Sequence, residues 1–172
     1  KGWLYEGGVR IPTIVKYPGV VKAGSQSKSV IINTDYFPTL LEVAELQTYP
    51  DAHVDGLSFR SVLRTGIPRN RGELFWHSPL GRPTSTGDSN SSAFMLGDYK
   101  LIEFFDPGVV ELYNLAEDLW ETSNLAEKMP ERTRELLDLL HSWQMEVGAE
   151  GMDPNPAYDP EYLRENYIHQ PK

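Results

Sequence analysis

The first ten residues gather the charged side chains that could take part in chemistry. Lys1, Glu6 and Arg10 supply two cations and one carboxylate, and Gly7-Gly8 lies between the acid and the arginine. A glycine pair lets the backbone take positive φ or pass close to a ligand. An acid and a base that flank such a pair can also bind each other. We therefore interpret Glu6, Gly7, Gly8 and Arg10 as residues that hold this loop in register.

Other polar patterns suggest chemistry that their spacing does not support. His53 has acidic neighbours on both sides, but no third type of ligand follows at metal spacing, so we predict no metal site. Thr34-Asp35 precedes an apolar run, and we interpret its side-chain oxygens as a helix cap rather than as a catalytic acid. His77 closes an aromatic run before Ser78-Pro79. This sequence context is compatible with His77 on the plain surface and with His77 at the edge of a pocket.

Short elements are expected around these residues in the first part of the chain. The apolar run 11–17 predicts a buried strand, which places the glycine pair in a loop that feeds a sheet. Apolar residues at helical spacing predict a helix over 34–46. A second helix is expected over 58–65, with Gly66 as its stop signal.

From residue 73 onward, apolar runs alternate with tight-turn signals. Gly97-Asp98 and Asp106-Pro107-Gly108 are turn sequences that join neighbouring strands as hairpins. The runs between the turns predict an antiparallel sheet with strands over 73–77, 92–96, 99–105 and 109–115.

The clearest helix is predicted over 130–147. Pro130 suits its first turn and Gly148 ends it. Leu136, Leu140 and Trp143 step by four and three residues and form one apolar face. We expect this face to cover one side of the sheet, with the other side in water. The predicted fold class is α+β: a four-stranded antiparallel sheet packed by a C-terminal helix.

Composition narrows the possible partners. The 172 residues carry 16 basic and 25 acidic side chains, and the net charge of −9 argues against nucleic acid because phosphate binding needs a basic face. No apolar run approaches the length of a membrane span. The chain has no cysteine, which excludes disulfides and thiolate metal sites and leaves the compartment open.

Four stretches, in order along the chain, carry a resemblance to a known family. They are K-G-x-L-Y-E-G-G-x-R-x-P at 1–12, T-D-x-x-P-T-L at 34–40, D-G-x-S at 55–58, and G-D-x-K-L at 97–101 with E-L-Y-N-L at 111–115 and E-x-x-N-L at 121–125. Together they resemble the type I, formylglycine-dependent sulfatases, a family of arylsulfatase-like enzymes. The resemblance covers residues 1–150, and it places this chain in the C-terminal portion of such an enzyme.

The resemblance implies roles for particular residues and segments. In that family the lysine at the head of the first motif contacts the sulfate, a catalytic and substrate-binding role that falls on Lys1. A histidine after the aromatic strand lies near the mouth of the substrate pocket, which makes His77 a second substrate-binding candidate. The predicted strand and helix in 1–66 would end an alkaline-phosphatase-like α/β domain. Residues 67–150 would form the antiparallel subdomain, and 151–172 an extended tail.

The same resemblance implies that this chain depends on a partner. Family members use Ca²⁺ and a formylglycine made from a C/S-x-P-x-R motif, but this sequence has neither that motif nor the D-D and D-N pairs of the calcium site. We expect no cofactor on this chain itself and no activity from it alone. The expected partners are a preceding sulfatase portion or another copy of the chain, with a sulfated small molecule or glycan as substrate. The family favours a periplasmic or extracellular location.

Two alternatives stay open. The chain could be a non-catalytic module that binds a carbohydrate or protein through Phe75-Trp76 and the turn-rich loop 81–90. It could also be part of a related phosphonate monoester hydrolase, which shares the superfamily scaffold.

Overall fold

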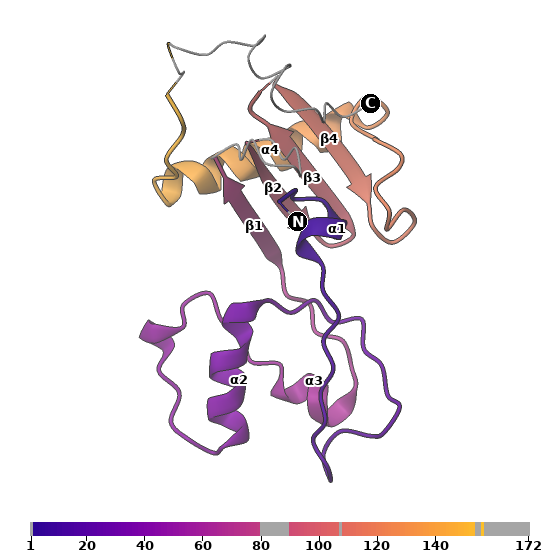
Figure 1. Cartoon of the computed structure of the whole chain (residues 1–172), viewed down its shortest axis with the longest axis vertical. Coiled ribbons are helices and arrows are strands. Elements are labelled where there is room, and N and C mark those ends of the chain that lie inside the picture. The colour runs from indigo at the N-terminus through magenta and orange to yellow at the C-terminus, as the bar shows by residue number, and fades with distance from the viewer. Residues whose placement is uncertain (1, 80–89, 107, 154–155, 157–172) are drawn as a thin grey trace. The chain divides into compact units, whose positions relative to one another are not determined.

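The computed structural model describes residues 2–79, 90–106, 108–153 and 156, and these fall into two compact units. Unit 1 contains the chain up to Ile11 together with everything from Glu73 onward, and unit 2 is Pro12–Gly72. Figure 1 shows a sheet with a long helix in unit 1 and short helices in unit 2. The predicted division at residue 66 concerns the domains of a larger protein and stays a prediction.

Unit 1 is built on the predicted four-stranded antiparallel sheet. Its strands are β1 (Glu73–Ser78), β2 (Ser91–Leu96), β3 (Tyr99–Phe104) and β4 (Val109–Asn114), hydrogen-bonded in that order. The hairpin glycines Gly97 and Gly108 take φ values of 62° and 82°, which glycine adopts without steric cost. The predicted fold class is confirmed, because each strand pairs with the next along the chain.

Helix α4 (Pro130–Glu146) covers one face of the sheet, as predicted (Figure 1). Leu136 and Leu140 are fully buried in a cluster with three strand residues, Phe94, Leu101 and Leu112. Trp143 stacks on Phe75, with the ring centroids 4.5 Å apart and the planes 6° from parallel. The apolar face read from helical spacing is therefore the face that packs on the sheet.

The opposite face of the sheet is covered as well, so the prediction of a water-facing side was wrong. Residues 3–10 lie across it and include helix α1 (Glu6–Val9) (Figure 1). Leu4 is buried there in a cluster with Ala93, Ile102, Phe104 and Tyr113. A strand covered on both faces reads as a continuous buried run, and this explains why β2 is buried along almost its whole length.

Unit 2 consists of short helices joined by longer connections. They are η1 (Asn33–Asp35), α2 (Tyr36–Val43), η2 (Pro50–Ala52) and α3 (Arg60–Thr65). Gly66 ends α3 in the left-handed conformation at φ 69°, as the sequence predicts. Helix α2 ends three residues before the predicted Leu46, and Glu45 at φ 55° lies outside the right-handed helical region.

The predicted strand over 11–17 is not formed. Within the described residues, no backbone hydrogen bond joins Pro12–Lys16 to another segment, and Ile14 is 94% exposed. A strand exists through its ladder of bonds to a neighbouring strand, and the described part of unit 2 contains no strand to pair with. The prediction of a buried strand over 11–17 was therefore wrong for this chain, because the run is neither paired with another described segment nor buried.

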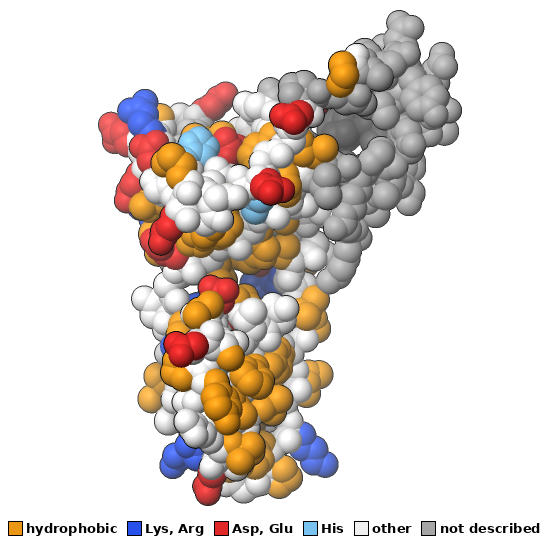
Figure 2. All heavy atoms as spheres, turned by 90° about the vertical axis from the view of Figure 1, so that its left-hand side faces the viewer, with side chains coloured by type: hydrophobic (Ala, Val, Ile, Leu, Met, Phe, Trp, Pro, Cys, Tyr) orange, Lys and Arg blue, Asp and Glu red, His pale blue; other side chains and the backbone are white. Residues whose placement is uncertain are grey.

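Unit 2 leaves large hydrophobic side chains in solvent. The exposed fractions are 94% at Ile14, 79% at Val54 and 61% at Leu40. Figure 2 shows hydrophobic side chains gathered on one face of this unit. Contiguous exposed apolar surface of this kind marks an interaction site in folded proteins.

Candidate functional site

The residues that follow Lys1 form a segment fixed on the sheet of unit 1. We call Trp3–Arg10 the N-terminal segment. Its Leu4 is 8% exposed, and the rings of Trp3 and Tyr5 lie 6.1 and 5.9 Å from that of Phe104. Lys1, the predicted sulfate contact, lies outside the described residues. The structure does describe the contacts that hold the N-terminal segment, which begins two residues after Lys1.

A fully buried lysine on the central strand β3 makes a charged contact with this segment. The Nζ of Lys100 lies 2.9 Å from Glu6 Oε1 and 2.9 Å from Glu121 Oε1, and the lysine side chain is 0% exposed. The contact to Glu6 is a hydrogen bond, whereas Glu121 Oε1 is held as an ion pair without hydrogen-bond geometry. A buried cation requires such carboxylates, because isolated charge in a protein interior is very costly. We call these three residues the Lys100 cluster.

Glu121 also binds the backbone of the N-terminal segment. Its Oε2 accepts a hydrogen bond of 2.6 Å from the amide N–H of Glu6, which opens α1. Glu121 itself has φ 54°, a left-handed conformation that costs a non-glycine residue about 1–2 kcal/mol. The fold tolerates this cost because the conformation places one carboxylate against both the Lys100 ammonium and the Glu6 amide.

Two tyrosines share a second carboxylate beside this cluster. The hydroxyls of Tyr5 and Tyr113 donate to Glu111 Oε2 over 2.6 and 2.9 Å. Burial, and then the hydrogen bond to the negative Glu111, raise the pKa of both tyrosines far above the usual value. Both hydroxyls therefore remain protonated donors throughout the physiological range.

The glycine pair has two different environments. A Cβ on Gly8 would lie 1.9 Å from the carbonyl oxygen of Trp3, so this close approach of backbone requires glycine. A Cβ on Gly7 would meet nothing within 4 Å. Both glycines, with Trp3 and Tyr5, line a shallow hollow of about 320 Å³ on the surface of unit 1.

The other predicted site residues occupy defined positions. Arg10 lies 3.3 Å from Glu6 Oε2 and is 61% exposed, so it contacts the acid from the solvent side. His77 uses both ring nitrogens within the chain: Nδ1 with the hydroxyl of Ser92 at 2.7 Å and Nε2 with the carbonyl oxygen of Glu150 at 2.8 Å. Contact of His77 with a substrate would require the Glu150 carbonyl to release Nε2.

Sequence reasoning missed the Lys100 cluster. Lys100 and Glu121 belong to the motifs that carry the family resemblance, but their spacing in the sequence does not predict a contact with Glu6. The available signal was a lone lysine in the otherwise apolar run Tyr99–Ile102. A charge in that position is either at a water-facing site or paired. Because the second face of the sheet is covered, Lys100 does not face water there and is paired instead.

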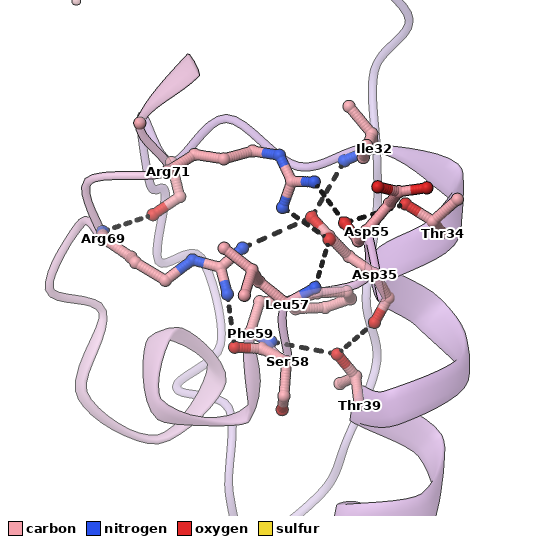
Figure 3. A network of polar contacts seen from close by, with 12 residues as sticks. Ile32, Thr34, Asp35, Thr39, Asp55, Leu57, Ser58, Phe59, Arg69 and Arg71 are labelled. Carbon is pink, nitrogen blue, oxygen red and sulfur yellow. Dashed lines mark hydrogen bonds and ion pairs between the residues drawn. The ribbon is translucent and has the colours of Figure 1, made fainter. Parts of the chain in front are cut away.

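Unit 2 contains a separate buried charge cluster, shown in Figure 3. Asp35 is completely buried, and its carboxylate lies 2.6 Å from Arg71 Nη1 and 3.3 Å from Arg69 Nη2. The same carboxylate accepts backbone N–H bonds from Ile32 and Leu57. It makes no side-chain cap to α2. Its bond from the Ile32 N–H is the capping-box contact of η1, which continues directly into α2, so the capping interpretation of Asp35 holds for this one contact. The bonds to Leu57, Arg69 and Arg71 were not predicted, and through them the carboxylate ties three segments of the unit together.

Two kinds of feature are absent from the described residues. No group of three or more His, Cys, Asp and Glu side chains among them could hold a metal ion. No helix that the structure describes is long and apolar enough to cross a membrane. Phe75 and Trp76 pack on opposite faces of the sheet, so they do not form the shared contact of the binding-module alternative.

Comparison with known proteins gives consistent matches. Residues 1–146 match the model of the family described as N-sulphoglucosamine sulphohydrolase, C-terminal. A protein named sulfatase from Formosa agariphila is 38% identical over 81% of this chain and 26% of its own length. N-acetylglucosamine-6-O-sulfatase from Bacteroides thetaiotaomicron is 29% identical over 84% of this chain and 26% of its own length.

A solved structure gives the same result in three dimensions. It superposes with a TM-score of 0.64 at 26% sequence identity, covering 84% of this chain and 30% of the other. That structure is described as a complex with its substrate, D-glucosamine-2-N,6-O-disulfate. The chain thus spans about a quarter of the length of the curated relatives it matches.

Proposed function

Because the chain belongs to the sulfatase family, as one of its C-terminal regions, we propose that it completes an enzyme that hydrolyses sulfate esters. The chain covers about a quarter of the relatives' length, and we propose a preceding portion as the remainder of that enzyme. The chain has no C/S-x-P-x-R motif and its described residues have no calcium cluster, so no step of the reaction is assigned to either group within it.

The catalytic contribution proposed for this chain is the cation of Lys1. A sulfate ester carries negative charge, and attack at sulfur builds further charge on the departing oxygen. A fixed cation stabilises such charge most when it is already in place before the reaction. The supporting observation is that the segment beginning two residues after Lys1 is held on the sheet by a buried ion cluster. Glu6, Gly7, Gly8 and Arg10 shape that segment in this proposal.

The proposed substrate is a sulfated sugar. Two relatives support this class: one is named an N-acetylglucosamine-6-O-sulfatase, and the other was solved with a glucosamine disulfate. His77 would contact the sugar only after losing its bond to Glu150, which makes it a secondary candidate for substrate binding. A periplasmic or extracellular location is proposed to fit such a substrate.

The exposed apolar face of unit 2 supports the proposed partner. Side chains such as Ile14, Leu40 and Val54 are in solvent in this chain, and burying them against the preceding portion of the enzyme would contribute about 1.5–3 kcal/mol each. A second copy of the chain is the alternative occupant. Sedimentation of the chain alone and mixed with the preceding portion distinguishes a self-dimer from a mixed complex.

The direct test compares the intact enzyme, with its preceding portion attached, with its Lys1→Ala variant. The substrates are 4-nitrocatechol sulfate and glucosamine 6-sulfate, and Lys128→Ala is the matched control because Lys128 is exposed in unit 1, away from the apolar face proposed to be buried. We expect kcat/KM to fall by about 100-fold or more in Lys1→Ala and to stay unchanged in the control. Wild-type turnover at the buffer rate on both substrates, or equal activity of both variants, would reject the proposal.

A further inference from the structure

We propose that Lys100 and Glu121 are positioning residues for Lys1, acting through the N-terminal segment. The inference rests on the proposed function, because it takes Lys1 as the residue that meets the sulfate. It goes further by naming the side chains that hold the segment which follows Lys1. Neither residue is expected to touch the substrate.

The first argument is the number of independent attachments to one short segment. Lys100 holds the side chain of Glu6, and Glu121 holds the amide of the same residue. Tyr5, one residue earlier, is bonded to Glu111. These contacts come from β3, from β4 and from the loop that follows β4. The segment is thereby fixed both along its length and across the sheet.

The second argument is burial. Lys100 is 0% exposed and Glu121 is 3% exposed, so neither charge is available to solvent or to a ligand. Charges in such surroundings interact more strongly than at a surface, because water screens them little. An arrangement of this kind is rigid, and a reacting group loses rate steeply when its support allows displacements of about 1 Å.

The third argument is the conformation of Glu121. A glutamate at φ 54° costs more than a glycine would at the same position. The described contacts of its carboxylate are with Lys100 and the Glu6 amide. The unfavourable backbone conformation of Glu121 therefore places its carboxylate in contact with the N-terminal segment, as a positioning role requires.

The first experiment uses the 172-residue chain itself and measures amide hydrogen exchange across Leu4–Val9. Lys100→Met removes the shared cation, and Glu121→Gly removes the carboxylate while suiting the positive φ. Lys128→Met, at an exposed lysine, is the control. We expect exchange in this segment to accelerate at least about 10-fold in both test variants and to remain unchanged in the control. Unchanged protection in Glu121→Gly would overturn the inference.

The second experiment is a double-mutant cycle in the intact enzyme. Lys100→Met should lower kcat/KM on 4-nitrocatechol sulfate by about 10–100-fold in the wild-type background. In the Lys1→Ala background the same change should have no further effect, since a positioning residue acts only through the group it positions. Rates are normalised to folded enzyme by circular dichroism. If Lys100→Met fails to fold, Glu121→Gly takes its place, because Lys100 then keeps Glu6 as its counter-ion.

The outcomes separate the two proposals. If Lys1→Ala retains full activity, the role of Lys1 is wrong, and the exchange experiment still decides whether the cluster holds the segment. If Lys1→Ala is impaired but Lys100→Met and Glu121→Gly lower kcat/KM equally in both backgrounds, positioning through Lys1 is refuted. Loss of the effect in the Lys1→Ala background supports it.

Discussion

Replacing Lys100 by methionine should be among the most destabilising substitutions in unit 1. The substitution keeps side-chain volume and removes the cation that lies 2.9 Å from both Glu6 and Glu121. Two carboxylates then face each other with little solvent, and Arg10 contacts only one of them from the surface. Removing one partner of a buried ion pair typically costs about 3–5 kcal/mol, because the remaining charge is left without compensation.

Urea unfolding followed by tryptophan fluorescence measures this cost. The four tryptophans, Trp3, Trp76, Trp120 and Trp143, all belong to unit 1, so their emission reports on that unit alone. With a slope of about 2 kcal/mol per molar urea, a loss of about 4 kcal/mol lowers the midpoint by about 2 M. Lys128→Met should leave the midpoint within about 0.3 M, because surface substitutions have small effects.

A triple variant tests whether the cost comes from charge rather than from packing. Lys100→Met combined with Glu6→Gln and Glu121→Gln removes all three charges, and the new amide side chain at position 121 keeps an acceptor for the Glu6 amide. Replacing a whole buried ion group by neutral residues is often close to neutral in stability. We therefore expect the triple variant to recover more than half of the lost midpoint. A shift below about 0.5 M in the single variant, or no recovery in the triple variant, would show that the cluster is not an electrostatic anchor.

Four further predictions concern other contacts. Trp143→Ala should lower the stability of unit 1 by about 2–4 kcal/mol in urea unfolding monitored by circular dichroism, because it removes the stack on Phe75. Met145→Ala is the control, and it should change the stability little because the Met145 side chain is exposed. Gly8→Ala should lower the melting temperature of unit 1 by several degrees, since its Cβ would collide with the Trp3 carbonyl, whereas Gly7→Ala should be neutral or slightly stabilising. Because the pKa values of Tyr5 and Tyr113 are raised in the folded chain, that chain binds more protons than the unfolded chain at a pH where ordinary tyrosines ionise. The free energy of unfolding should therefore fall as pH rises above about 10. Tyr113→Phe should make this fall less steep in unfolding measured across alkaline pH. Asp35→Asn should accelerate amide exchange at Leu57 while leaving the tryptophan-monitored transition unchanged, because every tryptophan lies in unit 1.

The sequence was sufficient to predict the sheet and the long helix because their signals are local. Tight-turn residues between apolar runs fixed the hairpins, and the spacing of Leu136, Leu140 and Trp143 gave the packed face of α4. The ends of the strands differ from the prediction by one residue at most. Local patterns also placed Gly66 and Gly148 at the ends of their helices.

The errors arose where the outcome depends on distant residues. The apolar run 11–17 has strand propensity, but pairing depends on a neighbour that the described part of unit 2 does not supply. Asp35 has the local pattern of a cap and makes one such contact, yet its carboxylate also binds Arg69 and Arg71, more than thirty residues away. The pairing of Lys100 with Glu6 spans 94 positions, and although the apolar run around Lys100 indicates that the lysine is paired or faces water, neither neighbourhood of sequence identifies Glu6 as the partner.

The motifs that carry the family resemblance are the points at which separate segments bind each other. In unit 1, Glu6, Lys100 and Glu121 come from three different motifs and meet in one buried cluster. In unit 2, the T-D-x-x-P-T-L and D-G-x-S motifs meet in the same way. Leu57 donates its N–H to Asp35, and a Cβ on Gly56 would lie 2.5 Å from the carbonyl oxygen of Thr34.

This arrangement explains how short motifs can determine a fold while contributing few catalytic groups. Each motif supplies one half of a buried charge pair or of a close backbone contact. Such contacts form only when both halves are present, because an unpaired half costs several kcal/mol. They therefore favour a single arrangement of segments more strongly than apolar packing, which tolerates substitution by residues of similar size. In unit 1 the arrangement selected in this way is the one that holds the chain next to Lys1.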